Sequence, residues 1–193
     1  MPEIRAKIAV LVLPALLVAG CSTAAAEWPT GVAGGSAGLS DPGSDPDTDP
    51  AQGGIPSGKD LTPFDTSYPA VGKLDPALLT AVQKAATDAK ARGIEFKVTS
   101  GWRSKAYQQR LLEEGVQKYG SLEKARQFVN TPEKSTHVSG KAVDLGPTDA
   151  DDWLIRHGDD YGLCQAYSNE LWHFELLTTP GGTCPQPLPN AAG

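Results

Sequence analysis

Apolar and polar residues follow two different periods along this chain. Apolar side chains repeat every three or four positions in residues 75–93 and again in residues 104–116, a spacing that predicts two amphipathic helices. Asp75 and Pro76 suit the N-cap and the first position of the former helix, and Gly93 suits its C-terminal end. Weaker helical patterns occur in residues 121–129 and 150–156.

Strand-like patterns with a period of two are concentrated later in the chain. Phe96 and Val98 share one face of residues 95–100. Similar runs occur at residues 141–145, 163–167 and 171–177. Because the clearest helices come first and the strands cluster late, the sequence predicts an α+β fold in which a small, mainly antiparallel sheet is flanked by helices.

The composition changes sharply near residue 61. Residues 21–60 are dominated by Gly, Ala, Ser, Pro and Asp, so they cannot bury enough apolar surface to offset the loss of chain entropy. We therefore expect a disordered linker there, a folded domain in residues 61–188 and a flexible tail in residues 189–193. A folded part of about 130 residues is a common size for one domain with one hydrophobic core.

Residues 1–20 have the pattern of a secretory signal peptide. Arg5 and Lys7 precede an apolar run over residues 8–19, which is too short for a membrane-spanning helix. Small residues then lead to Cys21, and this ending resembles the lipobox of bacterial lipoproteins, in which the cysteine is lipidated. The resemblance implies an extracytoplasmic protein that is anchored to the bacterial cell membrane through Cys21 and faces the cell wall. The alternative is an ordinary cleaved signal with an incidental cysteine.

Two cysteines remain beyond Cys21, namely Cys164 and Cys184. An even pair in an oxidising compartment is the number expected for one disulfide. We predict that these two cysteines are bonded to each other, and the alternative is a pair of free buried thiols.

The charge balance argues against one class of partner. The chain has 17 Lys and Arg against 23 Asp and Glu, a net charge of −6. Proteins that bind nucleic acid present a basic patch or stripe, and this composition provides none. We therefore expect no nucleic-acid partner, and we expect a monomeric domain.

One of the three histidines, His137, lies just before a predicted strand that carries an acidic residue. If residues 141–145 form that strand, its large apolar side chains face the core and Asp144 lies on the opposite face, which it shares with a small alanine. Gly140 permits a sharp reversal of the chain, and this reversal would bring His137 next to Asp144.

Another histidine lies within the last predicted strand. The alternation predicts that Trp172, Phe174 and Leu176 face the core, with His173 and Glu175 on the opposite face. Glu175 is then either a partner that orients a metal-binding histidine or a member of a plain salt bridge.

Together these two segments offer a set of metal ligands. His137, Asp144 and His173 supply two neutral imidazoles and one carboxylate, which suits Zn²⁺ with a fourth position left open. An open position is what a catalytic zinc needs, provided that a carboxylate nearby can accept a proton from water. Glu170 is placed for that role.

The order of these residues resembles a known family. Ser-x-His is followed by Asp seven residues after the His and later by Glu-x-Trp-His, and a Ser-Gly-Trp-Arg-Ser segment precedes them at residues 100–104. This pattern resembles the VanY and VanX group of zinc D-Ala-D-Ala peptidases, which are LAS-type metallopeptidases, over residues 74–177. The resemblance implies a single zinc-peptidase domain of the hedgehog/DD-peptidase type with one Zn²⁺ per chain.

The resemblance also implies an activity and a set of roles. The enzyme would be a zinc-dependent D-alanyl-D-alanine carboxypeptidase that hydrolyses the terminal D-Ala of peptidoglycan stem peptides. His137, Asp144 and His173 would bind the metal, and Glu170 would act as general base and then as general acid.

Three further residues match positions that contact substrate in the family. Arg103 would help to bind the substrate and to stabilise charge at the scissile carbonyl, because a guanidinium is a permanently charged, planar donor. Ser135 would donate a hydrogen bond to the substrate, and Gln108 would lie at the edge of the pocket.

Two alternatives to this activity stay open. A related endopeptidase would cut inside the stem peptide, for example at the L-Ala-D-Glu bond that some relatives cleave. A non-catalytic zinc-binding lipoprotein would recognise the cell wall without cutting it, but such a protein has no need of a base such as Glu170 beside the metal.

Overall fold

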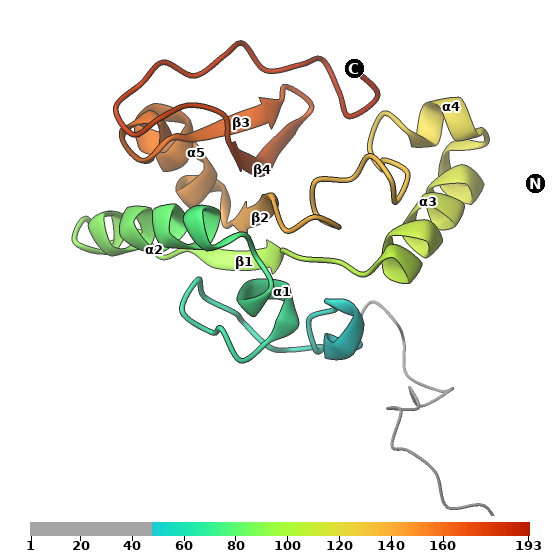
Figure 1. Cartoon of the computed structure of the whole chain (residues 1–193), viewed down its shortest axis with the longest axis horizontal. Coiled ribbons are helices and arrows are strands. Elements are labelled where there is room, and N and C mark those ends of the chain that lie inside the picture. Colours follow the sequence, from blue (N-terminus) through green and yellow to red (C-terminus); the bar gives the residue numbers. More distant parts are fainter. Residues whose placement is uncertain (1–47) are drawn as a thin grey trace, which may run out of the picture. The chain divides into compact units, whose positions relative to one another are not determined.

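The computed structural model describes residues 48–193, and Figure 1 shows their arrangement. The predicted signal peptide, the predicted lipidation site at Cys21 and most of the predicted linker lie outside the described residues. Within residues 48–193, no helix has the length and apolar character needed to cross a membrane. The elements in chain order are η1 (Pro50–Gln52), α1 (Pro69–Gly72), α2 (Pro76–Lys90), β1 (Lys97–Ser100), α3 (Lys105–Tyr119), α4 (Leu122–Ala125), β2 (Ala142–Gly146), α5 (Thr148–His157), η2 (Gly158–Tyr161), β3 (Leu163–Tyr167) and β4 (Glu170–Leu176).

The four strands form one sheet in the order β1-β2-β4-β3. Each neighbouring pair of strands is antiparallel. The connection between β3 and β4 is a short hairpin. The connection from β1 to its neighbour β2 is longer and contains α3 and α4. The α+β fold with a small antiparallel sheet is thus confirmed.

The core lies between the sheet and the two helices α2 and α5. Helix α5 packs against β2, β3 and β4, and α2 packs against α5 and β3. Large apolar side chains from every layer meet there, and burial of each contributes roughly 1.5–3 kcal/mol. The cluster includes Leu78 and Val82 of α2, Val143 and Leu145 of β2, Trp153 of α5 and Phe174 of β4.

Helices α3 and α4 pack against each other beyond the end of the sheet (Figure 1). Ser104 caps α3 by accepting a hydrogen bond from the N–H of Tyr107 at 3.0 Å, and Gly120 ends it with φ of 81°. The helix predicted at residues 121–129 is shorter in the structure, because the chain leaves helical geometry after α4. Helix α3 and residues 128–130, which follow α4, thereby form one wall of the candidate site.

The packed part of the chain begins before the predicted boundary at residue 61. Asp49 caps η1, and the N–H of Ser104 donates to the carbonyl of Gln52 at 2.9 Å. Gly53 is buried, and a side chain at that position would collide with the backbone beside α3. Hydrogen bonds hold much of this segment, and Ile55 is its apolar side chain that packs against the core, which is why composition did not reveal it.

The C-terminal segment is tied back to the sheet. A disulfide joins Cys164 of β3 to Cys184, with the two Cα atoms 5.6 Å apart. Leu188 then forms a parallel bridge with the end of β3, and the N–H of Ala191 donates to a backbone carbonyl just after α4 at 3.3 Å. The chain end is therefore brought to the edge of the candidate site.

Removal of the disulfide is expected to destabilise the domain without unfolding its core. The bond closes a loop with a sequence separation of 20, which restricts the unfolded chain by about 3 kcal/mol. The double variant Cys164→Ser/Cys184→Ser should therefore melt roughly 10 °C below the parent protein in a calorimetric scan. Reductant should lower the melting temperature of the parent and leave that of the variant unchanged. Two alkylatable thiols in the untreated parent, seen by intact mass, would contradict the bond.

Candidate metal centre

The pairing of β2 with β4 sets two of the candidate ligands side by side. Asp144 and His173 are directly opposed partners in this antiparallel pair. Their side chains point away from the apolar core that Val143 and Phe174 enter, yet both are buried. His173 is 3% exposed and Asp144 is 6% exposed.

His137 reaches the same place from a turn that precedes β2. Gly140 has φ of 71°, and a Cβ atom there would lie 2.5 Å from the carbonyl oxygen of Lys73. Only glycine therefore suits this position, and the turn that it allows carries His137 back to Asp144. The Nδ1 atom of His137 is 2.8 Å from the carbonyl oxygen of Gly101, which fixes the direction of the ring.

The three ligand atoms form a small triangle. The distance from His137 Nε2 to His173 Nδ1 is 3.2 Å, and Asp144 Oδ1 lies 3.3 Å and 3.1 Å from the same two nitrogens. A tetrahedral zinc site with bonds of about 2.0–2.1 Å requires ligand atoms roughly 3.3 Å apart. The donor set and its spacing therefore fit Zn²⁺. Within residues 48–193, these three residues form the candidate metal-binding group.

Hydrogen bonds on the outer side of each imidazole define which nitrogen faces the triangle. His137 donates its Nδ1–H to the carbonyl of Gly101, so Nε2 is left as the acceptor. His173 donates its Nε2–H to Oε1 of Glu175 at 2.9 Å, so Nδ1 is left as the acceptor. Thr136 also donates to Oε1 of Glu175 at 2.9 Å. Of the two roles considered for Glu175, the structure thus favours that of orienting a ligand.

Arg103 holds the carboxylate of the triangle from behind. Its Nη2 donates to Oδ2 of Asp144 at 2.9 Å, while Oδ1 of the same carboxylate faces the two histidines. Its Nε donates to Ser100 at 2.8 Å and its Nη1 to Gln108 Oε1 at 3.3 Å. Three of the five N–H groups of a guanidinium are thus engaged, and the others are available to a ligand.

Charge around the cluster has predictable effects on protonation. Burial alone would raise the pKa of Asp144, but His137, His173 and Arg103 outweigh it and hold the pKa well below its usual range. Burial and the charge of Arg103 lower the pKa of His137. Burial also acts to lower the pKa of His173, but hydrogen bonds to Asp144 and Glu175 raise it to about 9. A ligating imidazole is neutral, so metal binding would displace that proton.

Glu170 stands at the edge of the triangle, at the first position of β4. Its Oε2 is 3.7 Å from Nδ1 of His173, and its Oε1 is buried without a hydrogen-bond partner among the described residues. Burial is the main cause that raises the pKa of Glu170 to about 7. A carboxyl group with this pKa and an unpaired oxygen is suited to exchange a proton near neutral pH.

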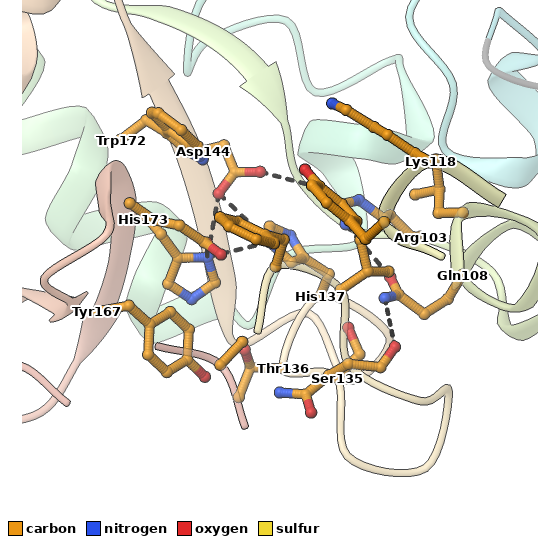
Figure 2. Close-up of a pocket in the computed structure, with 17 residues that line it drawn as sticks. Arg103, Gln108, Lys118, Ser135, Thr136, His137, Asp144, Tyr167, Trp172 and His173 are labelled. Carbon is orange, nitrogen blue, oxygen red and sulfur yellow. Dashed lines mark hydrogen bonds and ion pairs between the residues drawn. The ribbon is translucent and has the colours of Figure 1, made fainter. Parts of the chain in front are cut away.

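The cluster opens into a cavity of about 400 Å³, hereafter the first pocket. Figure 2 shows the ligands converging, with Arg103 and Gln108 on one side and Tyr167 on the other. Ser135, for which a substrate contact is predicted, is 7% exposed and lines this pocket. Gln108 also lines it, but its side chain binds Arg103 and the carbonyl of Asn130, so it supports the arginine.

Two further lining residues, Tyr167 and Lys118, were not assigned to the site from the sequence, and a third, Trp172, was assigned to the core. The ring of Tyr167 lies 4.9 Å from that of His173, and burial raises the pKa of this tyrosine to about 12, so it remains a phenol. Lys118 brings a positive charge to the rim of the pocket. Trp172 was predicted to face the core, and this was wrong, because it is 44% exposed and lines the pocket. Burial departs from strict alternation in this part of β4, where the register of its pairing with β3 shifts between Gln165 and Tyr167.

Solved structures with the same arrangement of elements include two VanY proteins. One is a mutant of the vancomycin-resistance D,D-pentapeptidase VanY from a VanB-type resistance cassette in complex with Zn(II), with 24% identity and a TM-score of 0.51 over 56% of this chain and 73% of that chain. The other is VanYB in complex with D-alanine-D-alanine, with 25% identity and a TM-score of 0.50 over 53% of this chain and 70% of that chain.

Comparison with sequences gives the family directly. No curated protein matches this sequence. A family model described as VanY, D-alanyl-D-alanine carboxypeptidase, matches residues 72–178, which cover the four strands, the ligand triangle and Glu170. Because this match spans more than half of the chain, the protein belongs to the VanY family of D-alanyl-D-alanine carboxypeptidases.

Proposed function

We propose that this protein is a zinc-dependent D-alanyl-D-alanine carboxypeptidase that removes the terminal D-Ala of peptidoglycan stem peptides. One observation carries the proposal: three ligand atoms lie 3.1–3.3 Å apart beside a buried, unpaired oxygen of Glu170. Ligands without a base would suit a structural metal, whereas this arrangement provides both parts of a hydrolytic site. Membership of the VanY family and the D-alanine-D-alanine complex of VanYB support the substrate.

His137, Asp144 and His173 would hold one Zn²⁺ with a fourth position open toward the first pocket. When bound, the ion supplies Lewis-acid polarisation of the scissile carbonyl. Glu175 and the carbonyl of Gly101 keep the two imidazoles in the required direction, and this costs no reorganisation when the substrate arrives.

Glu170 would move the proton that hydrolysis requires. Its free Oε1 accepts a proton from the attacking water as the water oxygen bonds to the carbonyl carbon. The same carboxyl group then donates this proton to the amide nitrogen as the C–N bond breaks, so that D-alanine leaves with a neutral amine. Arg103 has N–H groups left to stabilise negative charge that develops on the carbonyl oxygen.

The first pocket favours a substrate with a free carboxylate over one that continues past the scissile bond. Ser135 offers a buried hydroxyl, and Lys118 adds a positive charge at the rim. Ala191, from the C-terminal segment, also lines this pocket. A pocket with a buried hydroxyl and a cation at its rim suits the carboxyl end of a D-Ala-D-Ala peptide, which favours the carboxypeptidase over the endopeptidase.

We also propose that the domain acts outside the cytoplasm, held to the membrane by lipid at Cys21. The sequence before residue 48 supports this, through its signal pattern and the lipobox-like ending. Cys21→Ser should shift the protein from the membrane fraction to the soluble extracytoplasmic fraction of cells that express it. Retention of the variant in the membrane fraction would contradict a lipid anchor at this residue.

Replacement of the base should separate metal binding from turnover. Glu170→Gln keeps the size of the side chain but removes the proton acceptor, so kcat should fall by about 10³-fold. The zinc content, measured by metal analysis after dialysis, should stay near one per chain. Glu133→Gln changes an exposed glutamate and should leave both quantities unaltered. An active Glu170→Gln protein would refute the proposed mechanism.

Replacement of Glu175, the partner of His173, should weaken zinc binding and leave the proton transfer by Glu170 intact. Glu175→Gln removes the negative charge that orients and polarises the imidazole, so the affinity for zinc should fall by roughly 10–100-fold. Competition with a metal-binding dye measures this change, and added zinc should restore most of the activity. An unchanged affinity would show that Glu175 has no part in holding the metal.

A further inference from the structure

A second hollow, of about 450 Å³, adjoins the first pocket. Arg103, Leu111, Asp144 and Trp172 line both, so the two hollows adjoin along these residues, and Asp144 is the member of the ligand triangle that lines the second one. The second hollow, hereafter the second pocket, extends from there toward the start of α5. None of the steps assigned above uses it.

The second pocket contains a carboxylate with one buried oxygen that has no partner. Asp151 lies in the early part of α5, lines this pocket and is only 6% exposed. Its Oδ1 is buried and has no hydrogen-bond partner within residues 48–193. A buried carboxylate without a partner is costly, so a site with this feature is complete only when a cation or donor enters it.

The surroundings of Asp151 do not provide that cation. Burial raises the pKa of Asp151 to about 6, and the negative charges of Asp152, Asp144 and Asp149 act in the same direction. Arg103 is the cation that lines the second pocket, and its Nη2 is bound to Asp144. The carboxyl group is therefore largely ionised at neutral pH and attracts a positive charge from outside the domain.

The other walls of the second pocket suit an ammonium group on an alkyl stem. Leu111, Leu145 and Pro147 present apolar surface on which methylene groups can pack. Trp172 presents an indole ring, the aromatic side chain that interacts best with cations. The hydroxyl of Thr148 can accept a further hydrogen bond from an ammonium.

The charges of the two pockets also define the direction of a bound peptide. Lys118 lies at the rim of the first pocket, and Asp151 lies in the second, beyond the Arg103 and Asp144 that the two pockets share. A substrate whose free carboxylate lies toward Lys118 can therefore extend its preceding residues past this shared wall toward Asp151. A carboxylate in the second pocket would instead be repelled.

We propose that Asp151 binds a primary ammonium group on the side chain of the residue that precedes the D-Ala pair of the substrate. The inference rests on the proposed function and deepens it, because it makes the protein selective for stem peptides with an unmodified diamino acid at that position. Asp151 is then a specificity-determining residue that takes no part in the proton transfers.

The test uses the full-length, zinc-loaded protein with Glu170→Gln, so that peptides bind without being cut. Isothermal titration compares N-acetylated pentapeptides that end in D-Ala-D-Ala and carry either lysine or norleucine at the third position. The lysine peptide should bind about 10-fold more tightly, as expected for one charge-assisted contact in a partly buried site. Addition of Asp151→Asn should bring the ratio close to one, whereas addition of Asp152→Asn, which changes an exposed neighbour, should preserve the preference.

The possible results separate this inference from the function on which it rests. Equal binding of the two peptides, or a preference that survives Asp151→Asn, would overturn the inference while release of D-Ala by the parent protein still upholds the carboxypeptidase. If a norleucine peptide with a free N-terminus binds as tightly as the lysine peptide, the ammonium comes from the peptide terminus and the side-chain assignment is wrong. If neither peptide binds and the parent releases no D-Ala, both proposals fall.

Matching melting temperatures of the Asp151→Asn and Asp152→Asn proteins would exclude a folding defect as the cause of lost preference.

Discussion

The antiparallel pairing of β2 with β4 is the constraint on which the rest of this structure depends. It opposes Asp144 to His173 on one face of the sheet and Val143 to Phe174 on the other. A slip by one residue would exchange the two faces, which would bury the ligands in the core and expose the apolar side chains. The burial of the core therefore fixes the geometry of the site, and hydrophobic packing supplies the energy that holds three electron-pair donors together.

Three converging acceptors repel one another unless a positive charge lies among them, and a proton on His173, whose pKa is raised to about 9, or a metal ion supplies it. The supporting contacts all act to keep the acceptors in place: Glu175 and Gly101 take the outer imidazole protons, and Arg103 takes the second oxygen of Asp144. Glu170 is left with an oxygen that no described group satisfies. Such an arrangement lowers stability and is explained by function, because each unsatisfied group becomes satisfied when metal, water and peptide are bound.

Local patterns in the sequence were sufficient for the fold class and for the residues of the triangle. Asp75 and Ser104 mark helix starts, and Gly140 marks the reversal that places His137, because these effects act over a few residues. The predictions failed where several segments meet. Trp172 leaves the core face near the start of β4, and the segment before residue 61 is held largely by hydrogen bonds that composition does not reveal. Lys118 and Asp151 belong to separate helices, so only the tertiary structure shows that they line two adjoining pockets.

The first pocket, the ligand triangle and Glu170 together predict which product the protein releases. The most direct measurement is mass spectrometry of a stem pentapeptide ending in D-Ala-D-Ala after incubation with the zinc-loaded protein, beside a sample treated with a chelator. The account predicts loss of a single D-alanine, and no loss with chelator. A cut at another bond would show that the pocket does not select a free carboxyl end, and an intact peptide in the presence of bound zinc would contradict the assignment of the site as a carboxypeptidase.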